Sequence, residues 1–237
     1  MLEVDFHSHS LFSDCGIHTI VEMLTEAKRR GMAGLAITDH GRFVGGRVNS
    51  VFFERLREPV PGIRLLKGLE CNLKHDTFET DCPQSYLPMM DVVLLGLHDN
   101  VPHGLSKEAY TEILIRTLEK NSYVDIVSHP NMTDFPLDYT VLADAACRLD
   151  VVLEMNDSKV RMKRVADGET EALILACKRV GCRVSVDSDA HVLHEVGNDD
   201  SIRKLLKKHA FPEDRIVNCT AKSAFAFIEE RKERKLT

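Results

Sequence analysis

The sequence predicts an α/β protein in which seven parallel strands close into a single barrel. Short apolar runs alternate along the whole chain with segments that have helical periodicity, which is the pattern of repeated β–α units. The apolar runs are continuous, as in strands of a parallel sheet that is covered on both faces. Seven such units suit a closed barrel better than an open doubly wound sheet, although the pattern alone is compatible with both.

In the first half of the chain, strands are expected at residues 2–7, 34–38, 64–69 and 91–97. The spacing of Ile20, Leu24 and Ala27 predicts a helix over residues 19–30, and Gly31 is the expected stop. A short helix is expected over 49–58. Residues 74–90 have no periodicity and are expected to form the longest loop.

The second half continues the same alternation. Strands are expected at 124–128, 151–155 and 183–187, and helices at 106–121, 138–149, 169–180, 199–209 and 221–232. No linker, repeat or change of composition divides the chain, so residues 1–237 are expected to form one domain.

Composition excludes several classes of function. The formal net charge of −6 and the isoelectric point of about 6.0 argue against stable binding of nucleic acid. They leave room for a small phosphorylated substrate, because bound metal cations reverse the local field. No apolar run approaches the roughly 20 residues of a membrane span. Seven cysteines without a framework spacing indicate reduced thiols and a cytoplasmic protein, and nothing in the sequence predicts an oligomeric state.

Potential metal ligands follow six of the seven expected strands: His7, His9, His40, Glu70, His98, His129, Asp189 and His191. The C-terminal ends of parallel strands meet at one mouth of a barrel, so these side chains should converge. Imidazole and carboxylate groups suit Zn²⁺, Mn²⁺ or Fe²⁺. The set exceeds the three or four ligands of a mononuclear zinc site, which predicts two or three ions. Glu70 is the expected bridge, and Asp39 is expected to orient a metal-bound imidazole.

These residues also form an ordered series of motifs along the chain. The series is His7-x-His9, Ser13-Asp14, Thr38-Asp39-His40, Gly68-Leu69-Glu70, His98, Ser128-His129-Pro130 and Asp187-Ser188-Asp189-Ala190-His191. It resembles the polymerase and histidinol phosphatase (PHP) family from residue 5 to about residue 229. Within that family the chain is most similar to the small single-domain bacterial phosphatases with a trinuclear zinc site. The resemblance implies a distorted seven-stranded (β/α) barrel.

The resemblance also implies a division of the ligands among three ions. His7, His9, Glu70 and Asp189 would hold the first ion, His40 and His191 the second, and Glu70, His98 and His129 the third. Close relatives have a further histidine ligand of the second ion where this chain has Cys15. More distant members use the aspartate of a Ser-Asp-Gly turn, which Asp14 matches here. Asp14 is therefore the expected ligand, followed by His18 and then Cys15.

The expected activity is hydrolysis of a small phosphomonoester by a hydroxide that bridges the metal ions. Glu70, Asp189 and His191 would act through the metals, and Arg42, Arg47, Arg161 and Arg164 are the candidate phosphate-binding residues, with Lys159 and Lys163 nearby. The alternatives are a phosphodiesterase or exonuclease of the same family, an amidohydrolase, and a metal-binding module without catalysis. Amidohydrolases usually have a carbamylated lysine where this chain has His98, which favours phosphate chemistry.

Overall fold

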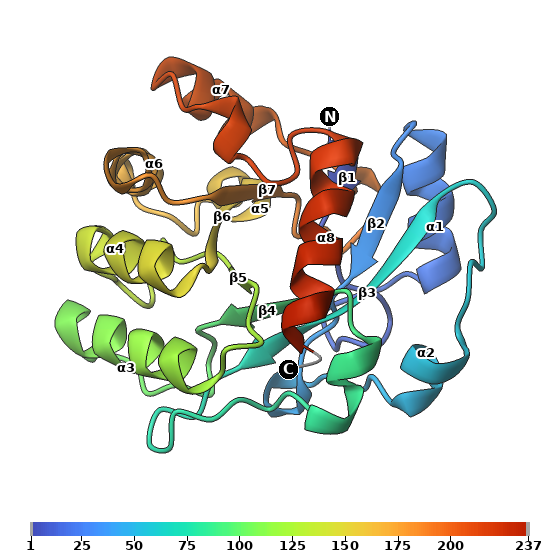
Figure 1. The fold of residues 1–237 in the computed structure, drawn as a ribbon, viewed down its shortest axis with the longest axis horizontal. Coiled ribbons are helices and arrows are strands. Elements are labelled where there is room, and N and C mark those ends of the chain that lie inside the picture. The colour runs from blue at the N-terminus through green and yellow to red at the C-terminus, as the bar shows by residue number, and fades with distance from the viewer. Residues whose placement is uncertain (1, 236–237) are drawn as a thin grey trace.

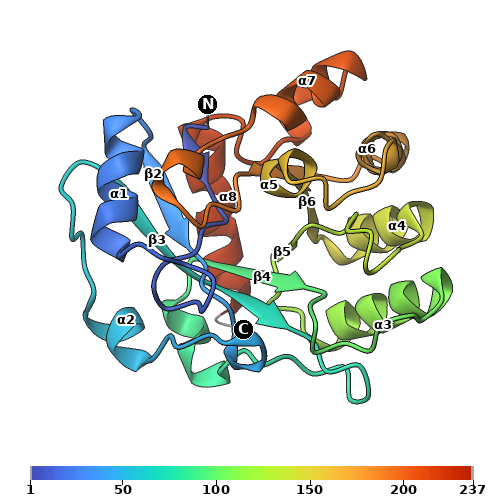
Figure 2. The same ribbon diagram turned by 180° about the vertical axis from the view of Figure 1, so that it is seen from behind.

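The computed structural model describes residues 2–235, and its centre is a barrel of seven parallel strands (Figures 1 and 2). The strands are β1 (Val4–Asp5), β2 (Gly34–Ile37), β3 (Arg64–Asn72), β4 (Val92–Gly96), β5 (Ile126–Val127), β6 (Val152–Asn156) and β7 (Val184–Asp187). They neighbour one another in sequence order, all in parallel register. A parallel bridge between Ser8 and Ala190 nearly closes the ring. This order confirms the predicted barrel and excludes a doubly wound sheet.

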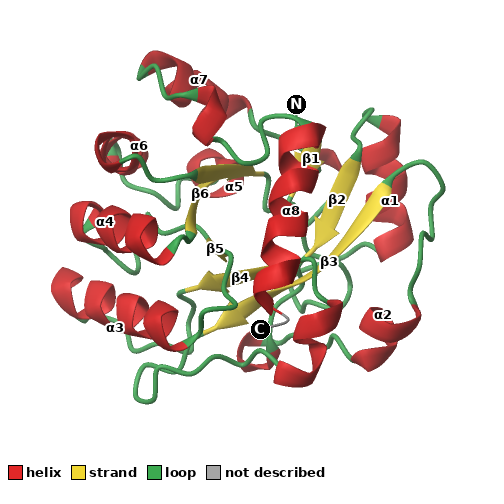
Figure 3. Cartoon of the chain, in the orientation of Figure 1, coloured by secondary structure: helices red, strands yellow, loops and turns green. Residues whose placement is uncertain are grey.

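The helices lie around the barrel and across one end of it (Figure 3). They are α1 (Ile20–Arg29), α2 (Ser50–Arg55), α3 (Lys107–Lys120), α4 (Tyr139–Leu149), α5 (Asp157–Arg161), α6 (Glu169–Val180), α7 (Asp200–Lys208) and α8 (Ala221–Lys235). The expected helices are all present. The sequence pattern missed α5 and a 3₁₀ turn over Gln84–Met89, because both are too short to show helical periodicity.

Helix α1 shows how local sequence sets an element. Thr19 and Glu22 form a capping box, in which each side chain bonds to the other residue's backbone N–H. The buried face of the helix includes Leu24 and Ala27, as the spacing predicts. Gly31 then adopts a φ of 79°, a left-handed conformation that costs glycine little and that turns the chain into β2.

The interior of the barrel has an apolar end and a polar end. Near the N-terminal ends of the strands, residues such as Leu66 and Val152 pack with Phe227 and Ile228 of α8, which crosses the barrel in Figure 1. Further along the same faces of β3 and β6, the buried side chains are Glu70 and Glu154. Helix α8 therefore closes the apolar end, and polar groups fill the opposite mouth.

Side chains replace part of the backbone ladder where β1 meets β7. Asp187 Oδ1 accepts a hydrogen bond of 2.8 Å from Phe6 N, and Asp5 Oδ1 accepts one of 3.1 Å from Ser188 N. Burial raises the pKa of Asp5 to about 6, although these hydrogen bonds oppose the shift. The substitution of carboxylates for ladder bonds explains why β1 is only two residues long, shorter than the apolar run predicts.

Candidate metal centre

At the C-terminal mouth of the barrel, the structure brings eight of the nine predicted ligands into groups of close ligand atoms; Asp14 belongs to none of these groups within residues 2–235. Their nitrogen and oxygen atoms form overlapping groups, each within 4.8 Å: His7 with Glu70 and His129, His7 with His9 and Asp189, His40 with Glu70 and His98, and His9 with Cys15, His40 and His191. The prediction that the strand ends deliver these side chains to one place is confirmed for those eight.

Glu70 occupies the middle of the cluster, at the point where the groups overlap. Its Oε2 lies 3.0 Å from His40 Nδ1 and 3.3 Å from His7 Nε2. Its Oε1 lies 2.8 Å from His129 Nε2 and 3.4 Å from His98 Nε2. The two oxygens of one carboxylate therefore face two different sets of imidazoles, which is the arrangement a bridging ligand requires.

Glu154, a residue that was not among the predicted site residues, orients His7. Its Oε1 lies 2.7 Å from His7 Nδ1, and its Oε2 accepts a 2.5 Å hydrogen bond from His129 N. A carboxylate can only accept at neutral pH, so Nδ1 carries a proton and Nε2 is the ring nitrogen that faces Asp189. The signal in the sequence was its place on a strand, where the alternation brings Glu154 to the inner face.

The side-chain hydrogen bonds of Asp39 go to the turn after β1. Its carboxylate accepts hydrogen bonds of 2.7 Å from Ser10 N, Ser10 Oγ and Ser13 Oγ. Ser13 Oγ in turn lies 3.2 Å from Nδ1 of His9. Asp39 therefore fixes the turn that begins at Ser10 and is linked to His9 through Ser13, so its role in orienting an imidazole stays a prediction.

The expected order of Asp14, His18 and Cys15 is also not what the structure shows. The Asp14 side chain is 67% exposed and lies 3.5 Å from Arg47 Nε, and it belongs to none of the ligand groups found in residues 2–235. His18 is half-buried beside Glu22 and belongs to none of the groups found in residues 2–235. Cys15 belongs to one of them, together with His9, His40 and His191.

Unpaired polar atoms test whether this cluster fits metal ions. Among the described residues, buried atoms without a hydrogen-bond partner include Glu70 Oε2, Asp189 Oδ1, His40 Nδ1 and both ring nitrogens of His98. Burial raises the pKa of Glu70 and Asp189, but the surrounding cationic groups outweigh it and hold both pKa values well below the usual range. Burying carboxylate oxygens and imidazole nitrogens that lack a hydrogen-bond partner costs free energy, and a bound cation would offset that cost. The residues of this cluster therefore fit divalent cations.

A cavity of about 800 Å³ opens over the cluster. Cys15, His98 and His191 lie on its wall, together with apolar groups such as Phe43 and Met162. A volume of this order suits a small organic molecule. The cavity therefore connects the polar end of the barrel to solvent and leaves room for a substrate next to the ligands.

Only one of the four predicted phosphate-binding arginines, Arg164, lines this cavity. Arg42 is exposed outside it, Arg47 pairs with Asp14, and Arg161 lies 3.0 Å from Glu195 Oε1. The structure therefore does not place these three side chains on the wall of the cavity, and Arg164 is the predicted arginine that lies there.

Lys159 lines the cavity and places its Nζ 2.5 Å from Asp189 Oδ2. It reaches this position because Asn156 caps α5 by accepting from Lys159 N, so that the helix starts directly at the end of β6. Lys159 is one of the basic residues after the sixth strand that were expected as possible substrate anchors. Asparagine at a strand end, three residues before the lysine, was the signal for this cap.

A barrel of parallel strands with imidazoles and carboxylates at its C-terminal mouth defines a class, the metal-dependent barrel hydrolases. The chain belongs to the PHP domain family, whose profile matches residues 5–210. A probable phosphatase from Shewanella sediminis is 32% identical over 96% of this chain and 94% of its own length. One from Acetivibrio thermocellus is 33% identical over 98% of this chain and 97% of its own.

A solved structure with the same fold is that of histidinol phosphate phosphatase from Lactococcus lactis, in complex with zinc, L-histidinol and phosphate. It is 18% identical, has a TM-score of 0.63, and the match covers 88% of this chain and 94% of that one. At this identity the likeness concerns the barrel only. Across residues 2–235, the structure has no helix that is both long and apolar enough to cross a membrane.

Proposed function

We propose that this PHP-domain phosphatase hydrolyses a small phosphomonoester with two or three divalent ions bound in the candidate metal centre. The observation that carries the proposal is the position of Glu70, whose two oxygens face separate sets of imidazoles beneath an open cavity. Such an arrangement serves neighbouring ions better than a single one. When bound, these ions would lower the pKa of a water molecule toward neutrality and offset the charge on a phosphoryl group.

The proposed ligand sets are those that the resemblance to the family implies. His7, His9, Glu70 and Asp189 would hold the first ion, and Glu70, His98 and His129 the third; their members come from overlapping groups of neighbouring side chains. Burial lowers the pKa of His98 to about 4, which keeps this imidazole neutral and able to coordinate a cation. Glu154 orients two of the ligands, because its carboxylate contacts the ring of His7 and the backbone N–H of His129. Little reorganisation of these two residues is therefore needed when ions bind.

Arg164 and Lys159 are the proposed anchors of the substrate phosphate. Both line the cavity, whereas Arg42 does not. We expect Arg164→Ala to raise KM for a phosphomonoester by about 10- to 100-fold, the loss of one charge-assisted hydrogen bond of roughly 1.5–3 kcal/mol. Arg42→Ala should leave KM unchanged. Steady-state kinetics of the two variants would refute this assignment if Arg42→Ala raised KM and Arg164→Ala did not.

The reaction class is tested with a substrate panel. The purified protein is loaded in turn with Zn²⁺, Mn²⁺ and Fe²⁺ and assayed on phosphomonoesters, phosphodiesters and amides. We expect the highest kcat/KM on a phosphomonoester, because the cavity accommodates a small leaving group beside the ligand cluster. Preference for diesters would favour the nuclease-like alternative, and amide hydrolysis without phosphatase activity would refute the proposal.

A further inference from the structure

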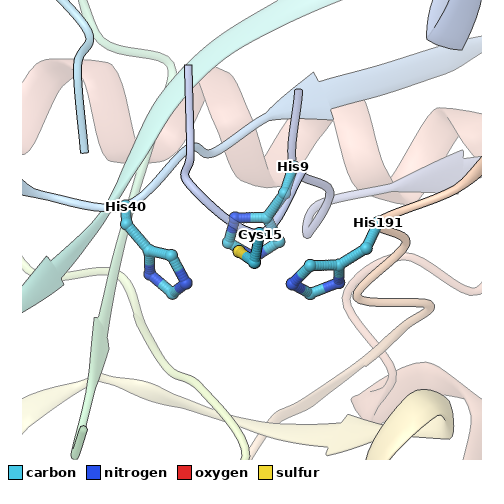
Figure 4. A group of neighbouring side chains, drawn as sticks. All are labelled: His9, Cys15, His40 and His191. Carbon is cyan, nitrogen blue, oxygen red and sulfur yellow. The ribbon is translucent and has the colours of Figure 1, made fainter. Parts of the chain in front are cut away.

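Cys15 lies between two imidazoles that approach each other from opposite sides of the cavity (Figure 4). His40 comes from the end of β2 and His191 from the loop after β7, and in each ring one nitrogen turns toward the gap between them. The Cys15 sulfur and the ligand nitrogens of His9, His40 and His191 all lie within 4.8 Å of one another. This is the geometry of a coordination site that includes a thiol.

The turn that carries Cys15 is tightly built. Ser13 N donates to Ser10 O at 3.0 Å, and Gly16 N donates to Ser13 O at 3.1 Å, so two turns follow each other directly. A Cβ on Gly16 would collide with Ser10 O, which explains the glycine. Asp39 accepts three hydrogen bonds from Ser10 and Ser13 and fastens this turn to the end of β2. The backbone that carries Cys15 is therefore fixed before any ion binds.

The neighbouring imidazole of His191 is oriented for metal binding by a contact with the backbone. His191 Nδ1 lies 2.9 Å from the backbone oxygen of Asp189. A carbonyl only accepts, so Nδ1 donates, and Nε2 is the ring nitrogen of His191 that can coordinate a metal ion.

We propose that Cys15 is a thiolate ligand which, together with His40 and His191, holds the second ion and makes that position select zinc over manganese. The inference rests on the metal centre of the proposed function and adds a property to one of its positions. The remaining groups offer only imidazole and carboxylate, which bind manganese and zinc alike. A thiolate is a soft ligand that favours zinc and disfavours harder cations such as Mn²⁺.

Cobalt provides a direct test, because a thiolate bound to Co²⁺ gives a sulfur-to-metal charge-transfer band in the near ultraviolet. We expect the band in the Co²⁺-loaded wild-type protein and in Cys147→Ala, a matched control at an exposed cysteine of α4 outside the cluster. Cys15→Ala should lack the band and bind one ion fewer. Cys15→His should lack the band, retain the ion, and lower the preference for Zn²⁺ over Mn²⁺ by at least about tenfold.

The possible failures are distinguishable. An unchanged band in Cys15→Ala, or a wild-type protein that binds two or three Co²⁺ ions without any band, would overturn the thiolate ligand and leave the metal centre intact. A wild-type protein that binds no divalent ion would overturn the metal centre itself. Loss of phosphatase activity in Cys15→His with its full complement of ions would indicate a nucleophilic thiol instead of a ligand.

Discussion

Glu70→Ala is expected to remove more than one ion from the protein and to lower kcat/KM by at least about 10³-fold, the upper end of the loss caused by deleting one charge-stabilising group. The reason is that Oε1 and Oε2 of Glu70 face different histidines, at 2.8 Å from His129 and 3.0 Å from His40. Removal of one carboxylate would therefore weaken two ligand sets at once. Metal content after dialysis and steady-state kinetics measure the two effects.

A surface carboxylate supplies the control for this experiment. Glu112 lies on α3 and is 68% exposed, with Arg116 3.4 Å away as its ion-pair partner. Glu112→Ala should retain the wild-type metal content and activity, because it is remote from the cluster. Loss of a single ion in Glu70→Ala would contradict the bridging role, and an unchanged metal content would contradict the assignment of Glu70 as a ligand.

Gly96→Ala is expected to disrupt the part of the centre that contains His98, with at least a 100-fold loss of kcat/KM. A Cβ at this position would collide with the His98 ring. It would also lie 2.7 Å from Ser128 Oγ and 3.1 Å from Glu70 Oε1. Alanine is otherwise acceptable in a strand, so the effect would arise from the missing space beside the ligands. The measurements are kcat/KM, metal content, and the thermal midpoint Tm as a check on folding.

Gly34→Ala is the matched control for the loss of space. Gly34 also lies in a strand, and its added Cβ would meet Phe225 Cε1 at 3.1 Å, far from the ligand cluster. This variant should bind the same number of ions as the wild type, whatever its Tm. If Gly96→Ala retained full metal content and activity, the close packing around His98 would not be needed for the centre.

The barrel could be predicted because strands buried on both faces are continuous in hydrophobicity and because glycines such as Gly31 mark helix ends. The lengths of β1 and β5 could not. Each has only two residues in ladder register, since side-chain hydrogen bonds of Asp5 and Asp125 occupy neighbouring backbone N–H groups. Hydrogen bonds in which a side chain replaces a backbone partner depend on tertiary contacts, so they leave no periodic pattern in the sequence.

The same division applies to the site. Ligands at strand ends were predictable, because the topology of a parallel barrel alone brings His7, Glu70 and His129 together. The third ligand of the second ion could not be predicted. Asp14 and Cys15 are adjacent, and only the geometry of the turn decides which of them lies beside the imidazoles. In helices and strands, the direction of a side chain follows from its position in a regular repeat. An irregular turn has no such repeat, so the sequence does not show where its side chains point.

The most direct test of the account is a diffraction measurement of anomalous scattering at the zinc absorption edge, on crystals of the zinc-loaded protein. The account predicts two or three peaks at the C-terminal mouth of the barrel. Glu70 should lie between two of them, and Cys15 Sγ should be in contact with one flanked by His40 and His191. A single peak, or peaks that lie away from Glu70, would contradict the central claim of a multinuclear centre bridged by this carboxylate.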